Sequence, residues 1–154
     1  MDKLSNCLNE LESKISNSES LNLAISKSPV GWHIEHALLT IYVITERLKN
    51  SDPHDYTWKF NLPKILVFAI NKIPRGRAKA PGPVQPKNDL TMETLKKHIE
   101  STKRKLAELQ ILKPINYIEH PVFGKLKLKD SIKFLEIHTM HHIHIINDIL
   151  KPVK

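Results

Sequence analysis

The stretch FLEIHTMHHIHIINDIL, residues 134–150, has the clearest helical pattern in the chain and holds four of its nine histidines. Apolar residues and histidines recur in it at steps of three and four, which is the spacing of one face of an α-helix. This stripe consists of Leu135, His138, His142, Ile145 and Ile149. We predict a long helix that starts after Asp130 or Ser131, ends before Pro152 and buries the stripe against other helices.

Three further segments have the same period. The first has the stripe Leu4, Leu8, Leu11 and Ile15. The second opens with Ser28 as the expected N-cap and Pro29 in its first turn, and runs to about Asn50. The third begins near Thr91 and has the stripe Met92, Leu95, Ile99, Thr102, Leu106 and Leu109. Four amphipathic helices in one chain of 154 residues predict a helical bundle.

The second and third helices are separated by a long connection, residues 51–88. Residues 62–72 of this connection are apolar and predict a short extra helix, and four prolines follow them. A helix of 20 residues is about 30 Å long, so this connection can return along the whole bundle. We therefore predict an all-α fold: a four-helix bundle with a long crossover connection, containing a short extra helix, between helices two and three. One domain is expected to span residues 1–154.

Composition narrows the classes of function. Apolar residues make up 40% and charged residues 26% of the chain, as in globular proteins. Cys7 is the only cysteine, and no apolar run is long enough to span a membrane, so a cytoplasmic protein is expected. The net charge of +8 favours anionic partners, but the lysines are scattered and aromatic residues amount to 6%. We expect a small-molecule substrate and a homodimer, and no nucleic acid or membrane partner.

The proline-rich part of the connection is basic and holds Arg75, Arg77, Lys79 and Lys87. Long loops in compact domains often carry function, and often do not. The segment 73–87 is therefore interpreted in two ways. It is either a basic lid that helps to hold an anionic cosubstrate, or a surface loop.

The histidines are the candidate functional residues. His138 and His142 are four residues apart, so on a helix their side chains project from the same face, with about 5–6 Å between Cβ atoms. Buried imidazoles need partners, and a neutral imidazole is a good ligand for zinc, nickel or iron. A third ligand must come from another helix. The best candidate is His36 of the second helix, and His33, one turn earlier, is the alternative. The competing interpretation is a polar core of hydrogen-bonded histidines.

Two more histidines of the last helix are expected to lie beside this group. His141 projects about 100° around the helix from His142, so it is predicted to line a pocket or an interface between helices. His144 is predicted to face solvent or a dimer partner.

Three segments together resemble the DinB-like superfamily: GWHIEH at residues 31–36, HPVFGKL at 120–126 and FLEIHTMHH at 134–142. They are most similar to a branch of unknown function marked by an HP-x-FG-x-L loop. The resemblance implies a four-helix bundle whose divalent metal ion, often nickel or zinc, is held by one histidine of helix two and two of the last long helix. These positions correspond to His36, His138 and His142. Pocket or ligand-supporting roles are expected for His33, His141, Trp32, His120 and Phe123.

This sequence departs from the family pattern in two places. Trp32 precedes His36 by four residues, whereas in many relatives the tryptophan is about two turns ahead of the ligand. The residues after His142, Ile-His-Ile-Ile-Asn, also lack an arginine-glycine-glutamine sequence that is often present there.

The resemblance implies thiol-dependent S-transfer, in which a low-molecular-weight thiol attacks a small electrophile. A metal-dependent hydrolase is the second hypothesis, and its carboxylate would have to be Glu35 or Glu136, neither of which is well aimed on an ideal helix. The third is a non-enzymatic bundle that binds a ligand or dimerises. No residue stands out as a general base.

Overall fold

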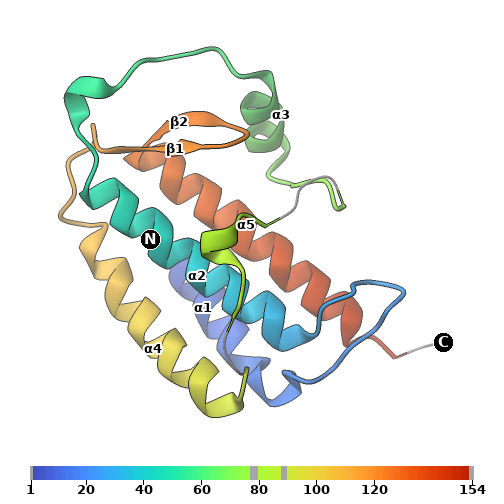
Figure 1. Cartoon of the computed structure of the whole chain (residues 1–154). Coiled ribbons are helices and arrows are strands. Elements are labelled where there is room, and N and C mark those ends of the chain that lie inside the picture. The colour runs from blue at the N-terminus through green and yellow to red at the C-terminus, as the bar shows by residue number, and fades with distance from the viewer. Residues whose placement is uncertain (1, 77–79, 88–89, 153–154) are drawn as a thin grey trace.

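The computed structural model describes residues 2–76, 80–87 and 90–152. Its long helices are α1 (Asp2–Ser13), α2 (Val30–Lys49), α4 (Met92–Glu108) and α5 (Leu128–Ile149), and they pack as a four-helix bundle (Figure 1). A short helix, α3 (Leu62–Ile70), and three 3-10 turns, η1 (Ile15–Asn17), η2 (Pro53–Asp55) and η3 (Gly82–Val84), complete the helical structure of the described residues. The predicted all-α bundle is confirmed.

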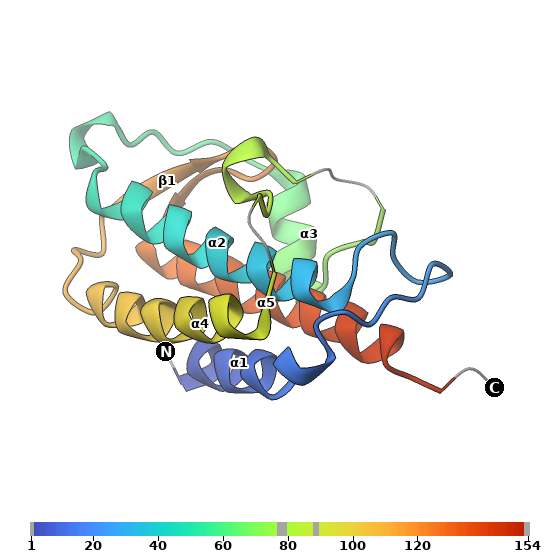
Figure 2. The same ribbon diagram turned by 60° about the horizontal axis from the view of Figure 1, so that its bottom comes forward.

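The predicted long connection is also confirmed. Helices α2 and α4 start at the same end of the bundle, so the chain between them has to return along its length (Figure 1). On the way it forms η2, α3 and η3, and η3 packs against α2. Figure 2 shows α3 and η3 on the side of the bundle away from α1 and α4. Arg77 and Lys79 of the basic segment lie outside the described residues.

The core follows the predicted stripes. Helix α1 buries Leu4, Leu8 and Leu11, while α4 buries Leu95 and Ile99, and each of these side chains is fully buried. Helices α2 and α5 pack against each other, and α4 and α1 pack against them and against each other. The prediction that Met92 belongs to the buried stripe of α4 is wrong, because its side chain is exposed at the first turn. Among the described residues, no helix has the length and hydropathy needed to cross a membrane.

Two predicted helix starts are displaced. Pro29, and not Ser28, occupies the N-cap position of α2, and the Ser28 N–H donates instead to Ser26 Oγ at 3.0 Å. Helix α5 begins at Leu128, before the predicted Asp130, because its first residue continues directly from a β-strand. The Leu128 N–H donates to the Asn116 carbonyl at 2.8 Å and so holds this start in place.

A two-stranded antiparallel sheet, β1 (Tyr117–His120) and β2 (Gly124–Lys127), was not predicted. The HP-x-FG-x-L segment forms its turn and second strand. His120 Nδ1 accepts hydrogen bonds from the backbone N–H groups of Val122 and Phe123, both at 3.2 Å. Gly124 has a φ of +66°, which a residue with a Cβ rarely adopts. The hairpin contacts both α2 and α5.

Candidate metal centre

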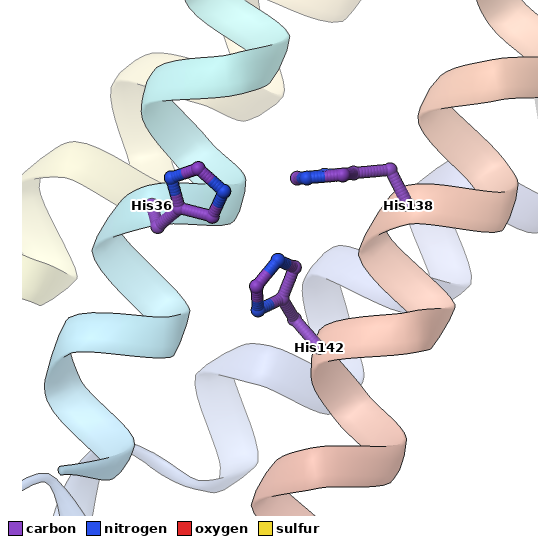
Figure 3. Close-up of side chains that lie close together, drawn as sticks. All are labelled: His36, His138 and His142. Carbon is purple, nitrogen blue, oxygen red and sulfur yellow. The ribbon is translucent and has the colours of Figure 1, made fainter. Parts of the chain in front are cut away.

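Packing of α2 against α5 brings His36, His138 and His142 together. His138 and His142 project from successive turns of α5, and His36 faces them from α2 (Figure 3). One ring nitrogen from each residue lies within 4.8 Å of those of the other two. The ring centroids are 4.7–5.1 Å apart. Of the two histidines left open in helix two, His36 is the one that faces this group.

The three imidazoles are held in the neutral form. Burial lowers the pKa of His138 and His142 well below the usual histidine value, and the neighbouring imidazoles lower it further. Burial also lowers the pKa of His36, although its hydrogen bond to the Val84 backbone opposes that shift. Neutral imidazole is the form with a free lone pair, which is the form that binds a metal.

The hydrogen bond of His36 leaves one of its nitrogens available. His36 Nδ1 lies 2.7 Å from the Val84 carbonyl oxygen, and a carbonyl only accepts, so Nδ1 carries the proton. The lone pair of the neutral ring is therefore on Nε2. Val84 belongs to η3, so the long connection orients a side chain of α2. Metal-ligating histidines commonly donate their second ring nitrogen to a carbonyl in this way.

A chain of hydrogen bonds links His142 to His33 and Ser26. His142 Nδ1 is 3.0 Å from His33 Nδ1, and His33 Nε2 is 2.9 Å from Ser26 Oγ. Ser26 Oγ accepts from the Ser28 N–H, and its hydroxyl can either accept from or donate to His33 Nε2, so the chain has two tautomeric arrangements. In the one that suits a metal, His33 Nε2 donates to Ser26, His33 Nδ1 accepts from His142, and the lone pair of His142 is left on Nε2. This arrangement satisfies every bond in the chain and leaves His142 able to bind a cation.

The third histidine has a buried nitrogen with no partner. His138 Nδ1 is buried and has no hydrogen bond among the described residues. Such an unsatisfied group costs about 1–3 kcal/mol, and a ligand of this imidazole can offset that cost. The donor set, three neutral nitrogens without a carboxylate in the group, suits zinc, nickel or iron better than magnesium or calcium.

Aromatic rings pack against two of the three histidines. Trp32 stacks on His36 with ring centroids 5.0 Å apart and meets His33 edge-on at 5.3 Å. On the other side, Phe134 lies 5.4 Å from the ring of His138. His120 and Phe123 stack on each other, and both contact Phe134 edge-on. All of these residues except Phe134 were expected around the pocket, and Phe134 lies one turn before His138.

The two candidate carboxylates point elsewhere. Glu35 accepts a hydrogen bond from His98 Nδ1 of α4 at 2.8 Å and is buried there. Glu136 lies near Cys7 of α1, where burial raises the pKa of the thiol first and the charges of Glu10 and Glu136 raise it further. Neither acid belongs to the group formed by the three histidines.

His141 and His144 lie on the next face of α5, at a cavity that also adjoins the segment after α3. The ring of His141 is 5.3 Å from that of His142, at right angles to it. Burial lowers the pKa of His141 to about 4, with smaller contributions from the charges of Arg75 and His144. His144 is exposed.

Removal of His33 should weaken metal binding without removing a ligand. In His33→Ala, His142 loses the acceptor that holds its proton on Nδ1, so we expect about a 10–100-fold loss of affinity for zinc or nickel. Competition with a chromophoric chelator measures this change. Exposed His54, on η2, provides the matched control, and His54→Ala should bind as tightly as the unmodified chain. Equal affinity in His33→Ala would show that the chain behind His142 has no influence on the centre.

Comparison with known proteins identifies the family. Residues 19–146 match the family described as the DinB superfamily, and the match includes all three histidines. No curated protein and no solved structure matches the chain. Since the family match covers most of the sequence, and the fold is the helical one of that family, the chain belongs to the DinB superfamily.

Proposed function

We propose that this protein is a metal-dependent transferase that joins a low-molecular-weight thiol to a small electrophile. His36, His138 and His142 would hold one divalent ion, either nickel, zinc or iron. The observation that carries the proposal is the convergence of three neutral imidazoles from two helices. Three nitrogen ligands leave coordination positions open, which is the pattern of a catalytic rather than a structural metal.

The reaction needs little from the protein besides positioning. When bound, such an ion would supply Lewis acidity, which lowers the pKa of a thiol so that it is deprotonated near neutral pH. The sulfur–carbon bond to the electrophile forms, the bond from that carbon to its leaving group breaks, and the thiol proton passes to solvent. Trp32 and Phe134 cover the rings of His36 and His138, while Val84 and His33 hold the rings of His36 and His142 in place.

Hydrolysis receives less support. It calls for a carboxylate that activates water beside the metal, and the two nearest acids in sequence are engaged with His98 or lie near Cys7. A non-enzymatic bundle draws support from the hydrogen bond between His33 and His142. It leaves the unpartnered nitrogen of His138 without an explanation.

The direct test is conjugation of cysteine to 1-chloro-2,4-dinitrobenzene by protein loaded with nickel, zinc or iron. We expect the absorbance of the thioether to rise faster than in metal-free protein, with chloride and a proton released. His36→Ala treated in the same way should match the uncatalysed background, and His54→Ala should keep the full rate. No rate above background with any of the three metals would contradict the transferase.

The homodimer and the cytoplasmic localisation expected from the sequence stay predictions. Helix α3 exposes several apolar side chains that a second copy could cover, namely Leu62, Ile65, Leu66 and Ile70. Sedimentation of the purified protein distinguishes monomer from dimer.

A further inference from the structure

A cavity of about 720 Å³ opens beside the three histidines. It lies between the segment that follows α3, residues 71–75, and the face of α5 that includes His141, His144 and Asp148. Its volume is within the range of about 300–1,000 Å³ that is usual for sites of small molecules. None of the three candidate metal ligands lines it, so it is a separate compartment next to the centre.

His141 connects this cavity with the metal centre. It lines the cavity, and its ring is 5.3 Å from that of His142. Arg75 lines the same cavity from the segment that follows α3. A small molecule in this cavity therefore lies next to the site where the thiol is proposed to react.

The charges of the lining favour an acid. Lys72, Arg75 and Lys151 contribute three permanent positive charges, and Asp148 is the one carboxylate among the lining residues. Asp148 accepts from Arg75 at 2.7 Å and from Lys151 at 2.6 Å, so these cations already bind a carboxylate in this place. Lys72 has no ion-pair partner within the part of the chain that the structure describes.

The rest of the lining suits a short carbon skeleton. Ile73 and Pro74 from the connection, with Ile137 and Met140 from α5, form an apolar wall beside the charged groups. We propose that this cavity binds the carboxylate end of a small organic acid that also carries the thiol. The carboxylate lies against Lys72 and Arg75, and the sulfur reaches past His141 toward the three histidines. The thiol part of this inference rests on the proposed function, and the acid part does not.

Calorimetric titration with succinate, a dicarboxylate without sulfur, tests the cavity alone. We expect Lys72→Gln to weaken binding roughly fivefold, because an exposed charge pair contributes up to about that factor. Lys97→Gln removes the same charge from an exposed position on α4, across the bundle from α3, and should leave the affinity unchanged (Figure 1). Asp148→Asn removes the competing carboxylate and should tighten binding. Absence of succinate binding, or equal affinities in all four proteins, would overturn the proposal.

Mercaptosuccinate separates the cavity from the metal chemistry. With nickel-loaded protein it should bind more tightly than succinate, and His36→Ala should abolish that advantage while succinate still binds. If the affinity for succinate depends on Lys72 but the thiol of mercaptosuccinate adds no affinity, the carboxylate site stands and the transferase proposal fails. If the higher affinity for mercaptosuccinate depends on His36 but Lys72→Gln changes the affinity for neither ligand, the transferase proposal stands and this cavity is not its acid site.

Discussion

Protein with His138 replaced by alanine is expected to retain almost no metal after purification without a histidine tag. Apparent binding free energies of protein zinc sites start at about 10 kcal/mol. If three ligands share such a value, the loss of one costs about 3 kcal/mol, which lowers affinity more than a hundredfold. Plasma mass spectrometry should find near-stoichiometric nickel, zinc or iron in the unmodified chain. The same loss is expected for His36→Ala, and His54→Ala should keep its metal.

The loss should not come from unfolding, and the structure provides a way to see this. Alanine leaves a cavity beside Phe134 and His142, and removal of the unsatisfied Nδ1 offsets part of that cost. Metal-free His138→Ala should therefore still unfold cooperatively, at a somewhat lower temperature than the metal-free unmodified protein. Metal-free, folded protein that cannot be loaded with any of these ions would contradict the site.

Acid should destabilise the metal-free protein steeply. Burial lowers the pKa of His33 and His120 from 6.5 to about 4, with His36 next to His33 and Arg47 next to His120 adding to the effect. In the unfolded chain these rings titrate near 6.5. Between these values the unfolded state binds more protons than the folded state, so stability is full above pH 6.5 and falls as the pH drops toward 4. Each ring contributes about 1.4 kcal/mol per pH unit once the pH is well below 6.5.

Two such rings already remove about 3 kcal/mol per pH unit from a total stability of about 5–15 kcal/mol, and the pKa values of His138 and His142 are lowered as well. The midpoint of urea unfolding should therefore fall sharply between pH 6.5 and 5 and stay almost level between pH 7 and 8. His120→Gln tests the contribution of one ring outside the metal group, since its midpoint should depend less on pH. A midpoint that does not change down to pH 5 would show that these histidines are protonated in the folded state.

The sequence predicted the helices and their buried faces because both depend on a period that neighbouring residues set. Leu4, Leu8 and Leu11 lie in the core for that reason, as do Leu95 and Ile99. The same period placed His138 and His142 on one face of a helix. It favoured His36 but left His33 open, and only the packing of α2 on α5 groups His36 with the pair and places His33 in a hydrogen bond with His142.

The sequence could not predict the contacts between distant loops and the site. The carbonyl of Val84 and the hydroxyl of Ser26 orient His36 and His33, and nothing in their local pattern marks either residue. The β-hairpin was missed because strands of four residues leave too short an alternation to recognise. Phe134 could have been predicted, because it lies one turn before His138 in the sequence. In the structure its ring contacts the ring of that histidine.

The hydrogen bond between His33 and His142 joins residues that are 109 positions apart in the chain. An unfolded chain can offer an ion little more than the local pair His138 and His142, so tight binding depends on a finished tertiary structure. During synthesis His36, the proposed third ligand, is made long before His138 and His142, so the three histidines could hold an ion only after residue 142 has emerged. Binding of the ion would then stabilise the folded state by mass action. The added free energy of unfolding grows with the logarithm of the free ion concentration divided by the dissociation constant. For this bundle, the supply of metal would act as a late step of folding.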